Sequence, residues 1–261
     1  MPAPKNRRHT WRTAKKQLIL VIMKTHNTRF LIRLMVLPFL LLATMGNSTA
    51  QQVIETEPLA PFTALDIDGP IRIELIPADE NQMQIILWDI DSKNISWRVK
   101  DHTLSIKTRK GLVNKRAYAD IKLFYREISR ITTIGGEVTT KYPLLCASLY
   151  LGAESSVGRM DLIVECNDIT IHTSGDNTVK VNGITEYASY EAKLGSHIEC
   201  LGLTASHVTA DVSGKAEIQL HANELLDARA VTGGNIFFKG EPVTLYIKKS
   251  TMGGVESVNN L

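Results

Sequence analysis

A short turn that contains glycine recurs about every 20 residues through the second half of this chain. From residue 152 to residue 253 the separations between successive turn glycines are 23, 20, 19, 19 and 20. A spacing this regular predicts a repeat architecture in which each repeat forms one structural unit. The glycines expected at the corners of these repeats, where a positive φ is needed, are Gly152, Gly175, Gly195, Gly214, Gly233 and Gly253.

Apolar and polar residues alternate between these turns. In "YEAKLG" (190–195) Tyr190, Ala192 and Leu194 share one face, and "VTADVSG" (208–214) repeats the pattern. A period of two is typical of strands with one buried face. The sequence therefore predicts an all-β fold, a β-solenoid whose coils of about 20 residues stack in parallel and in register. An antiparallel sandwich of hairpins, which also has closely spaced turns, stays open as the alternative.

The sequence predicts longer strands in residues 62–130 than in the repeats that follow. "FTALDIDGPIRIELIP" (62–77) predicts two strands around a turn at Gly69. We expect this region to form opening rungs or a strand-rich N-terminal cap, because an uncovered sheet edge invites aggregation. Regular coils would then occupy residues 131–258, and the complete solenoid domain residues 51–261.

Two tryptophans and one turn mark the expected cap. In "ISWRVKDHTLSIKTR" (95–109) two strands flank a turn at Asp101 and His102. Trp88 and Trp97 lie in its strands, and we expect both in the core of the cap rather than on a carbohydrate-binding platform.

The N-terminal segment has the layout of a secretory signal peptide. Residues 23–33 are basic, residues 34–45 are apolar, and small residues at 48 and 50 stand at the −3 and −1 positions of a cleavage site. We therefore predict a signal peptide over residues 23–50, with cleavage after Ala50 and export of the remainder. Residues 1–22 would be an extension from a mis-assigned start, and no membrane span is expected in the mature chain.

Charge is distributed unevenly along the chain. The first 50 residues hold nine of the 30 Lys and Arg and none of the 27 Asp and Glu, so the remainder has a net charge of −6. A polyanion would be repelled by such a surface, and nucleic acid is therefore not an expected partner.

Three cysteines follow the leader. Cys146, Cys166 and Cys200 form no CxxC motif and have no histidine at metal-ligand spacing, so neither a zinc site nor a disulfide framework is expected. Whether any two of them form a disulfide is left open by the sequence, because exported proteins can carry bridges but buried thiols are also common.

Sequence motifs of catalysis are missing from the chain. There is no GxSxG elbow, HExxH motif, P-loop or dinucleotide-binding fingerprint. We therefore expect no catalytic residues, no cofactor and no metal ligands. Several carboxylates within about one coil could hold calcium on one face of a solenoid, but their spacing lacks the repeat of known calcium coils and favours a solvated face; they are Glu154, Asp161, Glu165, Asp168 and Asp176.

Several short motifs occur in an order that resembles a known family. "FTALDIDGPIRIEL" (62–75), "VKDHTLSIK" (99–107), the repeated "SG" turns and "FKGEPV" followed by "STMGGVESV" (238–258) are similar to the putative auto-transporter adhesin, head GIN domain family. The resemblance covers about residues 60–258. It implies an exported, single-stranded, right-handed β-helix from a double-membraned bacterium. His102 departs from the pattern, because the family usually has glycine there.

These observations lead to one functional interpretation and one alternative. The interpretation is an exported, non-enzymatic β-solenoid in the periplasm or on the cell surface, which presents an extended surface for adhesion or cell-envelope interaction. An envelope protein or a polysaccharide would be its partner. The alternative is a carbohydrate-active enzyme, a lyase or a hydrolase, on the same scaffold.

Overall fold

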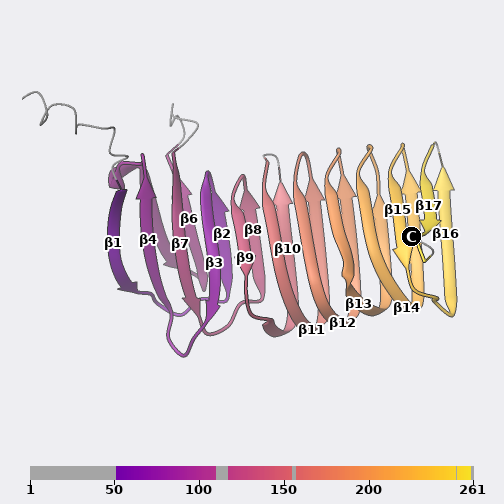
Figure 1. Ribbon diagram of the computed structural model, residues 1–261, viewed down its shortest axis with the longest axis horizontal. Helices are drawn as coiled ribbons and strands as arrows, with labels where there is room; N and C mark the ends of the chain where they lie inside the picture. Colours follow the sequence, from indigo (N-terminus) through magenta and orange to yellow (C-terminus); the bar gives the residue numbers. More distant parts are fainter. Residues whose placement is uncertain (1–50, 110–116, 155–156, 251, 260–261) are drawn as a thin grey trace, which may run out of the picture. The chain divides into compact units, whose positions relative to one another are not determined.

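The computed structural model describes residues 51–109, 117–154, 157–250 and 252–259. The expected signal peptide, its cleavage site at Ala50 and the extension 1–22 lie outside the described residues. Within them the fold contains strands, one short 3-10 helix at Ser92–Asn94 and no α-helix. The predicted all-β solenoid is confirmed, and successive coils are visible side by side in Figure 1.

Two walls of strands make up the solenoid, and we call them wall A and wall B. The opening strands are β1 (Gln51–Pro58), β2 (Ala64–Asp68), β3 (Ile71–Pro77), β4 (Gln82–Trp88), β5 (Ile95–Lys100), β6 (Thr103–Thr108), β7 (Tyr118–Tyr125), β8 (Arg130–Ile134) and β9 (Glu137–Thr140). The later strands are β10 (Leu144–Glu154), β11 (Arg159–Ser174), β12 (Thr178–Lys193), β13 (His197–Val212), β14 (Glu217–Val231), β15 (Asn235–Lys239), β16 (Thr244–Ser250) and β17 (Gly254–Ser257).

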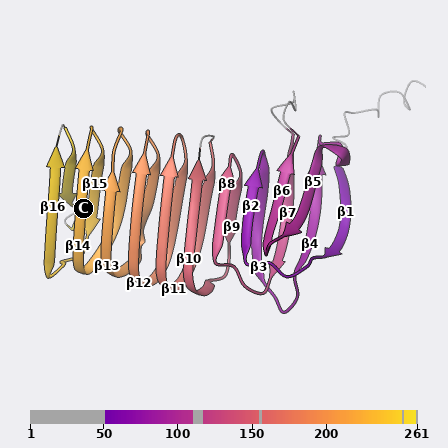
Figure 2. The ribbon, with the colours of Figure 1, turned by 180° about the vertical axis from the view of Figure 1, so that it is seen from behind.

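Each long strand belongs to both walls, because it bends near its middle. The first halves of β11 to β14 continue wall B, which runs β1, β4, β7, β3, β9, then these halves, then β15 and β17. The second halves continue wall A, which runs β5, β6, β2, β8, β10, then these halves, then β16. We call the segment between the two halves the bend. Figure 2 shows the same stack from behind.

Parallel pairing in register carries the stack from coil to coil. Between β11 and β12, for example, the pairs run from Arg159 opposite Thr178 to Ser174 opposite Lys193. From β10 onward every pairing between described strands is parallel. The alternative of an antiparallel hairpin sandwich is therefore wrong for the regular coils.

The core is a narrow column of small and branched side chains between the walls. Alternation places Tyr190 and Ala192 inside, where they are 1% and 0% exposed, and the next coil places Val208, Ala210 and Val212 beside them. Leu194 continues the alternation in sequence but is 70% exposed. Its φ is 55°, so the chain has already left the strand and entered the turn.

Most of the expected corner glycines have a positive φ, but two do not. Gly69, Gly175, Gly195, Gly214 and Gly233 have φ values between 65° and 117°. Gly152 instead lies within β10, opposite Thr132 and His172, which explains why the interval of 23 residues departs from the others. At the last corner the positive φ belongs to Met252 rather than to Gly253.

The opening rungs differ from the later coils in strand direction and strand length. The prediction of longer strands in residues 62–130 is wrong, because β7 has 8 residues whereas β11 continues through the bend for 16. β1, β4 and β7 pair antiparallel in wall B, and β5 pairs antiparallel with β6 at the edge of wall A. Trp97 of β5 packs against the buried core, as expected of a cap residue. Trp88 does not: it occupies an outward position of β4, whose buried residues are Met83, Ile85 and Leu87.

The turn between β5 and β6 has an unusual backbone. Asp101 has φ 48° and His102 has φ 56°, so both central residues of this two-residue hairpin are left-handed. Tight hairpins favour such a turn, because its twist matches that of the strands, and they normally place Gly second. Glycine is therefore the sterically favoured second residue here, and His102 carries a conformational penalty in this turn.

We predict that His102→Gly stabilises the protein by about 0.5–1 kcal/mol, because a left-handed conformation costs roughly 1–2 kcal/mol for a residue with a Cβ, and the greater entropy of unfolded Gly offsets part of the gain. Urea denaturation of the two proteins measures the difference. Lys100→Gly, which places glycine inside the adjacent strand, serves as the control and should destabilise by a similar amount. A destabilised His102→Gly variant would contradict this account of the turn.

Gly183 is the residue on which the bend of β12 most depends. Its φ is 128°, and a Cβ at this position would lie 1.9 Å from the carbonyl oxygen of Val164 on the neighbouring coil. The register between β12 and β13 also shifts between Lys180 and Gly183. Only glycine can therefore take this course without moving backbone.

We expect Gly183→Ala to lower the free energy of unfolding by about 3 kcal/mol or more, since backbone strain and overpacking each cost roughly 1–3 kcal/mol. Gly195→Ala is the matched control: φ is 82°, but a Cβ there meets no atom within 4 Å. That variant should lose only about 1–2 kcal/mol through strain. If urea denaturation gave the same loss of unfolding free energy for both variants, the close approach of residue 183 to Val164 would not contribute to the effect.

Candidate functional site

An aromatic and charged strip crosses the outer face of wall B at its opening end. The rings of Trp88 and Tyr118 are stacked, with centroids 6.0 Å apart and an angle of 18° between their planes. The guanidinium carbon of Arg72 lies 4.1 Å from the centroid of the Tyr118 ring, within the range of a cation–π contact. We call Trp88, Tyr118 and Arg72 the aromatic strip.

The strip is formed by three strands that are distant in sequence but adjacent in the sheet. Trp88 of β4 is opposite Tyr118 of β7, and β7 pairs in turn with β3, which carries Arg72. Because Ile71 and Ile73 point into the core, the alternation of β3 leaves Arg72 outside.

Carboxylates orient both ends of the strip. The indole nitrogen of Trp88 donates a hydrogen bond of 3.0 Å to Asp120, and Arg72 forms an ion pair of 3.4 Å with Glu137 of β9. The side chains of Arg72 and Glu137 remain 54% and 41% exposed. The strip is therefore held in place and is still accessible to a partner.

Two hollows adjoin the strip, and Arg72 and Glu137 line both of them. One has a volume of about 560 Å³ and is also lined by Gln84 and Lys122. The other has a volume of about 580 Å³ and includes Tyr118 in its lining. These volumes fall within the range of small-molecule binding sites. Trp88 lines neither hollow, so the hollows adjoin the strip through Arg72 and, in the second case, Tyr118.

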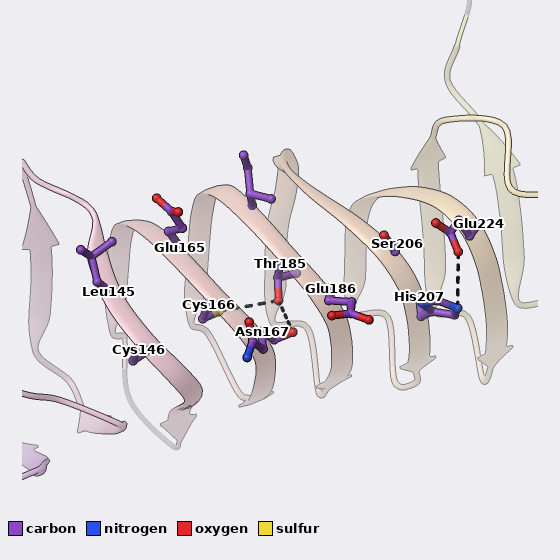
Figure 3. A pocket seen from close by; sticks show the side chains of 11 residues that line it. Leu145, Cys146, Glu165, Cys166, Asn167, Thr185, Glu186, Ser206, His207 and Glu224 are labelled. Carbon is purple, nitrogen blue, oxygen red and sulfur yellow. Dashed lines mark hydrogen bonds and ion pairs between the residues drawn. The ribbon is translucent and has the colours of Figure 1, made fainter.

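A further hollow, which we call the bend groove, follows the outer side of the bend across β10 to β14. It has a volume of about 690 Å³, and Figure 3 shows the side chains that line it. Leu145 and Ile184 lie along it and are 66% and 64% exposed. Cys166 and Thr185 are the buried residues of its lining and form its base.

Cys146 and Cys166 occupy the same register position on neighbouring strands of the bend. Cys166 lies between Cys146 on one side and Thr185 on the other, and its sulfur is 3.6 Å from the Thr185 hydroxyl. The contact with Cys146 lowers the pKa of the Cys166 thiol, although burial opposes the shift. The same contact, together with burial, raises the pKa of Cys146.

His207 and Glu224 lie at the other end of the bend groove. The His207 imidazole stacks on Tyr187 at 5.0 Å, and its Nε2 is 3.7 Å from a carboxylate oxygen of Glu224. His207 is two strands away from the coil that carries Cys166. Two strand spacings amount to about 9.6 Å, so this histidine is beyond reach as a base for the thiol.

The carboxylates that could have held calcium do not converge. Asp161 lies in the first half of β11 in wall B, Glu165 and Asp168 lie at the bend, Glu154 ends β10, and Asp176 follows β11 in an exposed turn. Among the residues that the structure describes, no three His, Cys, Asp or Glu side chains are grouped to hold a metal ion. In the same part of the chain no helix is long and apolar enough to cross a membrane.

Comparison with known proteins identifies the family. The model of the family described as "Putative auto-transporter adhesin, head GIN domain" matches residues 61–242. The chain belongs to this family. Among curated proteins no relative matches.

Solved structures of adhesin-like proteins share the fold. A putative adhesin from Bacteroides fragilis NCTC 9343 is 25% identical, with a TM-score of 0.74, over 81% of this chain and 98% of that one. A putative adhesin from Parabacteroides merdae ATCC 43184 is 19% identical, with a TM-score of 0.64, over 82% and 98%. A structure from Parabacteroides distasonis ATCC 8503, described as a putative lipid binding protein, is 18% identical, with a TM-score of 0.63, over 82% and 98%.

These likenesses support an adhesin-like protein more than an enzyme. The family name and the Bacteroides fragilis neighbour both refer to adhesion. The neighbours with lower identity show the fold alone. The sequence had indicated the family but not the aromatic strip, because the three side chains come from strands whose order in the sheet differs from their order in the chain.

The Cys146–Cys166 contact leads to a pH-dependent prediction. Alkylation of Cys166 by iodoacetamide, followed by peptide mass spectrometry, should be half-maximal at a pH below the ordinary thiol pKa of about 8.5, because the thiolate is the reacting form and its pKa is lowered. Cys146→Ala should move this midpoint towards the ordinary thiol value of about 8.5, whereas Cys146→Ser keeps a hydrogen-bond donor and should preserve part of the shift. Cys200 is an internal control, since burial raises its pKa to about 12. An unchanged midpoint in Cys146→Ala would contradict the assigned cause.

Proposed function

We propose that this protein is an exported, non-enzymatic β-solenoid that uses its outer surface for adhesion or cell-envelope interaction. The observation that carries the proposal is the aromatic strip, a Trp, a Tyr and an Arg fixed on the outer face of a rigid sheet. Its location would be the periplasm or the surface of a double-membraned bacterium.

The composition of the strip suits recognition better than folding. Trp, Tyr and Arg are the residues most enriched among those that dominate binding energy at interfaces. In this protein they lie outside the core and so contribute little to its packing. Since Asp120 and Glu137 already orient them, a partner would meet a surface with little conformational entropy left to lose.

A polysaccharide is the ligand class we favour. The flat rings can cover the apolar face of a sugar, while the surrounding Arg72, Glu137, Gln84 and Lys122 can donate and accept hydrogen bonds with its hydroxyl groups. The repeated walls offer an extended surface for a long chain, as is common in solenoids.

The non-enzymatic part of the proposal rests on the family and on the arrangement of side chains. The carboxylates of a lyase or hydrolase would have to converge near one bond of the sugar. The five carboxylates from Glu154 to Asp176 are instead spread around the perimeter of a coil. Three carboxylates line the hollow beside the strip, and each is engaged by a neighbour: Asp120 by Trp88, Glu137 by Arg72 and Glu74 by Lys141. The thiol of Cys166 and the imidazole of His207 are two strands apart and cannot act together.

A glycan array with the purified full chain, run with and without calcium, tests the proposal. We expect binding of a polysaccharide that weakens at least tenfold in a Trp88→Ala, Tyr118→Ala double variant. Tyr246→Ala is the matched control, because Tyr246 is 57% exposed on wall A, far from the strip; it should bind as the unaltered protein does. Circular dichroism of all variants verifies that they are folded.

Product analysis of each bound glycan separates the two functions. Recovery of intact polysaccharide supports a binding protein. Shortened or unsaturated products would overturn the non-enzymatic proposal in favour of a carbohydrate-active enzyme. Equal binding by the double variant would remove the strip from the function, and no binding to any glycan would reject polysaccharide as the ligand in favour of an envelope protein.

A further inference from the structure

Two of the three cysteines are brought together by the register of the bend. Leu144, Leu145 and Cys146 of β10 pair in parallel with Val164, Glu165 and Cys166 of β11. Neighbouring strands are about 4.7–4.9 Å apart, and Cα atoms of disulfides are usually about 4.4–6.8 Å apart. The backbone spacing at this pair is therefore compatible with a bridge.

The side chains of this pair also point to the same place. In-register parallel strands direct opposed residues to the same face, and both cysteines line the bend groove, where Figure 3 shows them on adjacent strands. Both are free thiols in this structure. Cys200 is fully buried in another part of the coil and does not line the groove.

We propose that Cys146 and Cys166 form a disulfide that joins two consecutive coils of the solenoid at the bend. The inference rests on the proposed export, because an oxidising compartment is where such a bridge would persist. The oxidant would be a disulfide, either of a protein oxidase or of a small molecule such as oxidised glutathione.

Two thiol–disulfide exchanges complete the reaction. The Cys166 thiolate attacks one sulfur of the oxidant's disulfide, a mixed disulfide forms, and the oxidant's second sulfur leaves as a thiolate. Cys146 then loses its proton, and its thiolate attacks the Cys166 sulfur and displaces the sulfur of the oxidant. The two cysteines lose two electrons and two protons in total, and the oxidant is reduced from a disulfide to two thiols.

The groove provides the conditions for this order of attack. Cys166 lies between Cys146 and the Thr185 hydroxyl, which is 3.6 Å from its sulfur, and its contact with Cys146 lowers the pKa of its thiol, which favours this thiolate as the first nucleophile. Cys146 is the more exposed of the two and is positioned directly beside the mixed disulfide.

The bridge would reinforce the pairing of the first two long strands of the regular coils. Ten residue pairs join β10 to β11, whereas fifteen join β11 to β12. A covalent link between β10 and β11 closes a loop of about 20 residues, which restricts the unfolded chain. We expect the melting temperature to rise by roughly 5–10 °C on oxidation.

Oxidation of the purified full chain tests whether the disulfide forms, independently of whether the protein is exported. The reduced protein is equilibrated in glutathione buffers of increasing oxidising strength, quenched with an alkylating agent and digested for mass spectrometry. We expect the loss of two hydrogen atoms, a cross-linked peptide that contains Cys146 and Cys166, and alkylated Cys200. Reductant should reverse the rise in melting temperature.

Matched variants identify the pair. Cys200→Ala should oxidise as the unaltered chain does, while Cys146→Ser and Cys166→Ser should each leave the melting temperature independent of the redox buffer. The proposal is overturned if both thiols stay free in the most oxidising buffer, if each ends as a mixed disulfide with glutathione, or if Cys200 enters a bridge. If the bridge forms in these buffers but the chain isolated from its own cells is reduced, the proposed export fails and the pairing stands.

Discussion

Parallel backbone hydrogen bonding between coils is the constraint on which the rest of this structure depends. Each coil holds too little apolar surface to fold alone, and it becomes stable only when the next coil pairs with it in register at about 4.8 Å. That spacing stacks like positions into columns, as Ile171, Tyr190, Ala210 and Ala228 do inside wall A. Every inward and outward surface follows from these columns.

The same columns determine which side chains become neighbours and can form a binding or reactive site. Residues far apart in the chain become neighbours at one strand spacing, which places Cys146 beside Cys166 and lowers the pKa of the Cys166 thiol. At the opening rungs the strand order is rearranged, with β7 between β4 and β3. That rearrangement assembles Trp88, Tyr118 and Arg72 into a strip, so the least regular part of the solenoid carries its most distinctive surface.

Much of the fold could be predicted from local pattern. Alternation identified Tyr190, Ala192 and Val208 as inward residues, and the spacing of turns indicated coils. The errors have local causes as well. Leu194 fits the alternation but lies in the turn, Gly152 fits the glycine spacing but lies in a strand, and Trp88 has a large apolar ring but an outward register. The alternation of apolar and polar residues shows the periodicity of a strand, but it does not show at which residue the strand ends.

The sequence by itself determined the class of this protein: an all-β solenoid with coils of about 20 residues and membership of an adhesin-like family. The fold class could be predicted because a strand's period and a turn's glycine are properties of neighbouring residues, and the family was indicated by the order of short motifs that resemble it. Only the tertiary structure decided which side chains meet, because contacts across coils depend on register and on the order of strands in the walls. The aromatic strip and the cysteine pair are both of this kind.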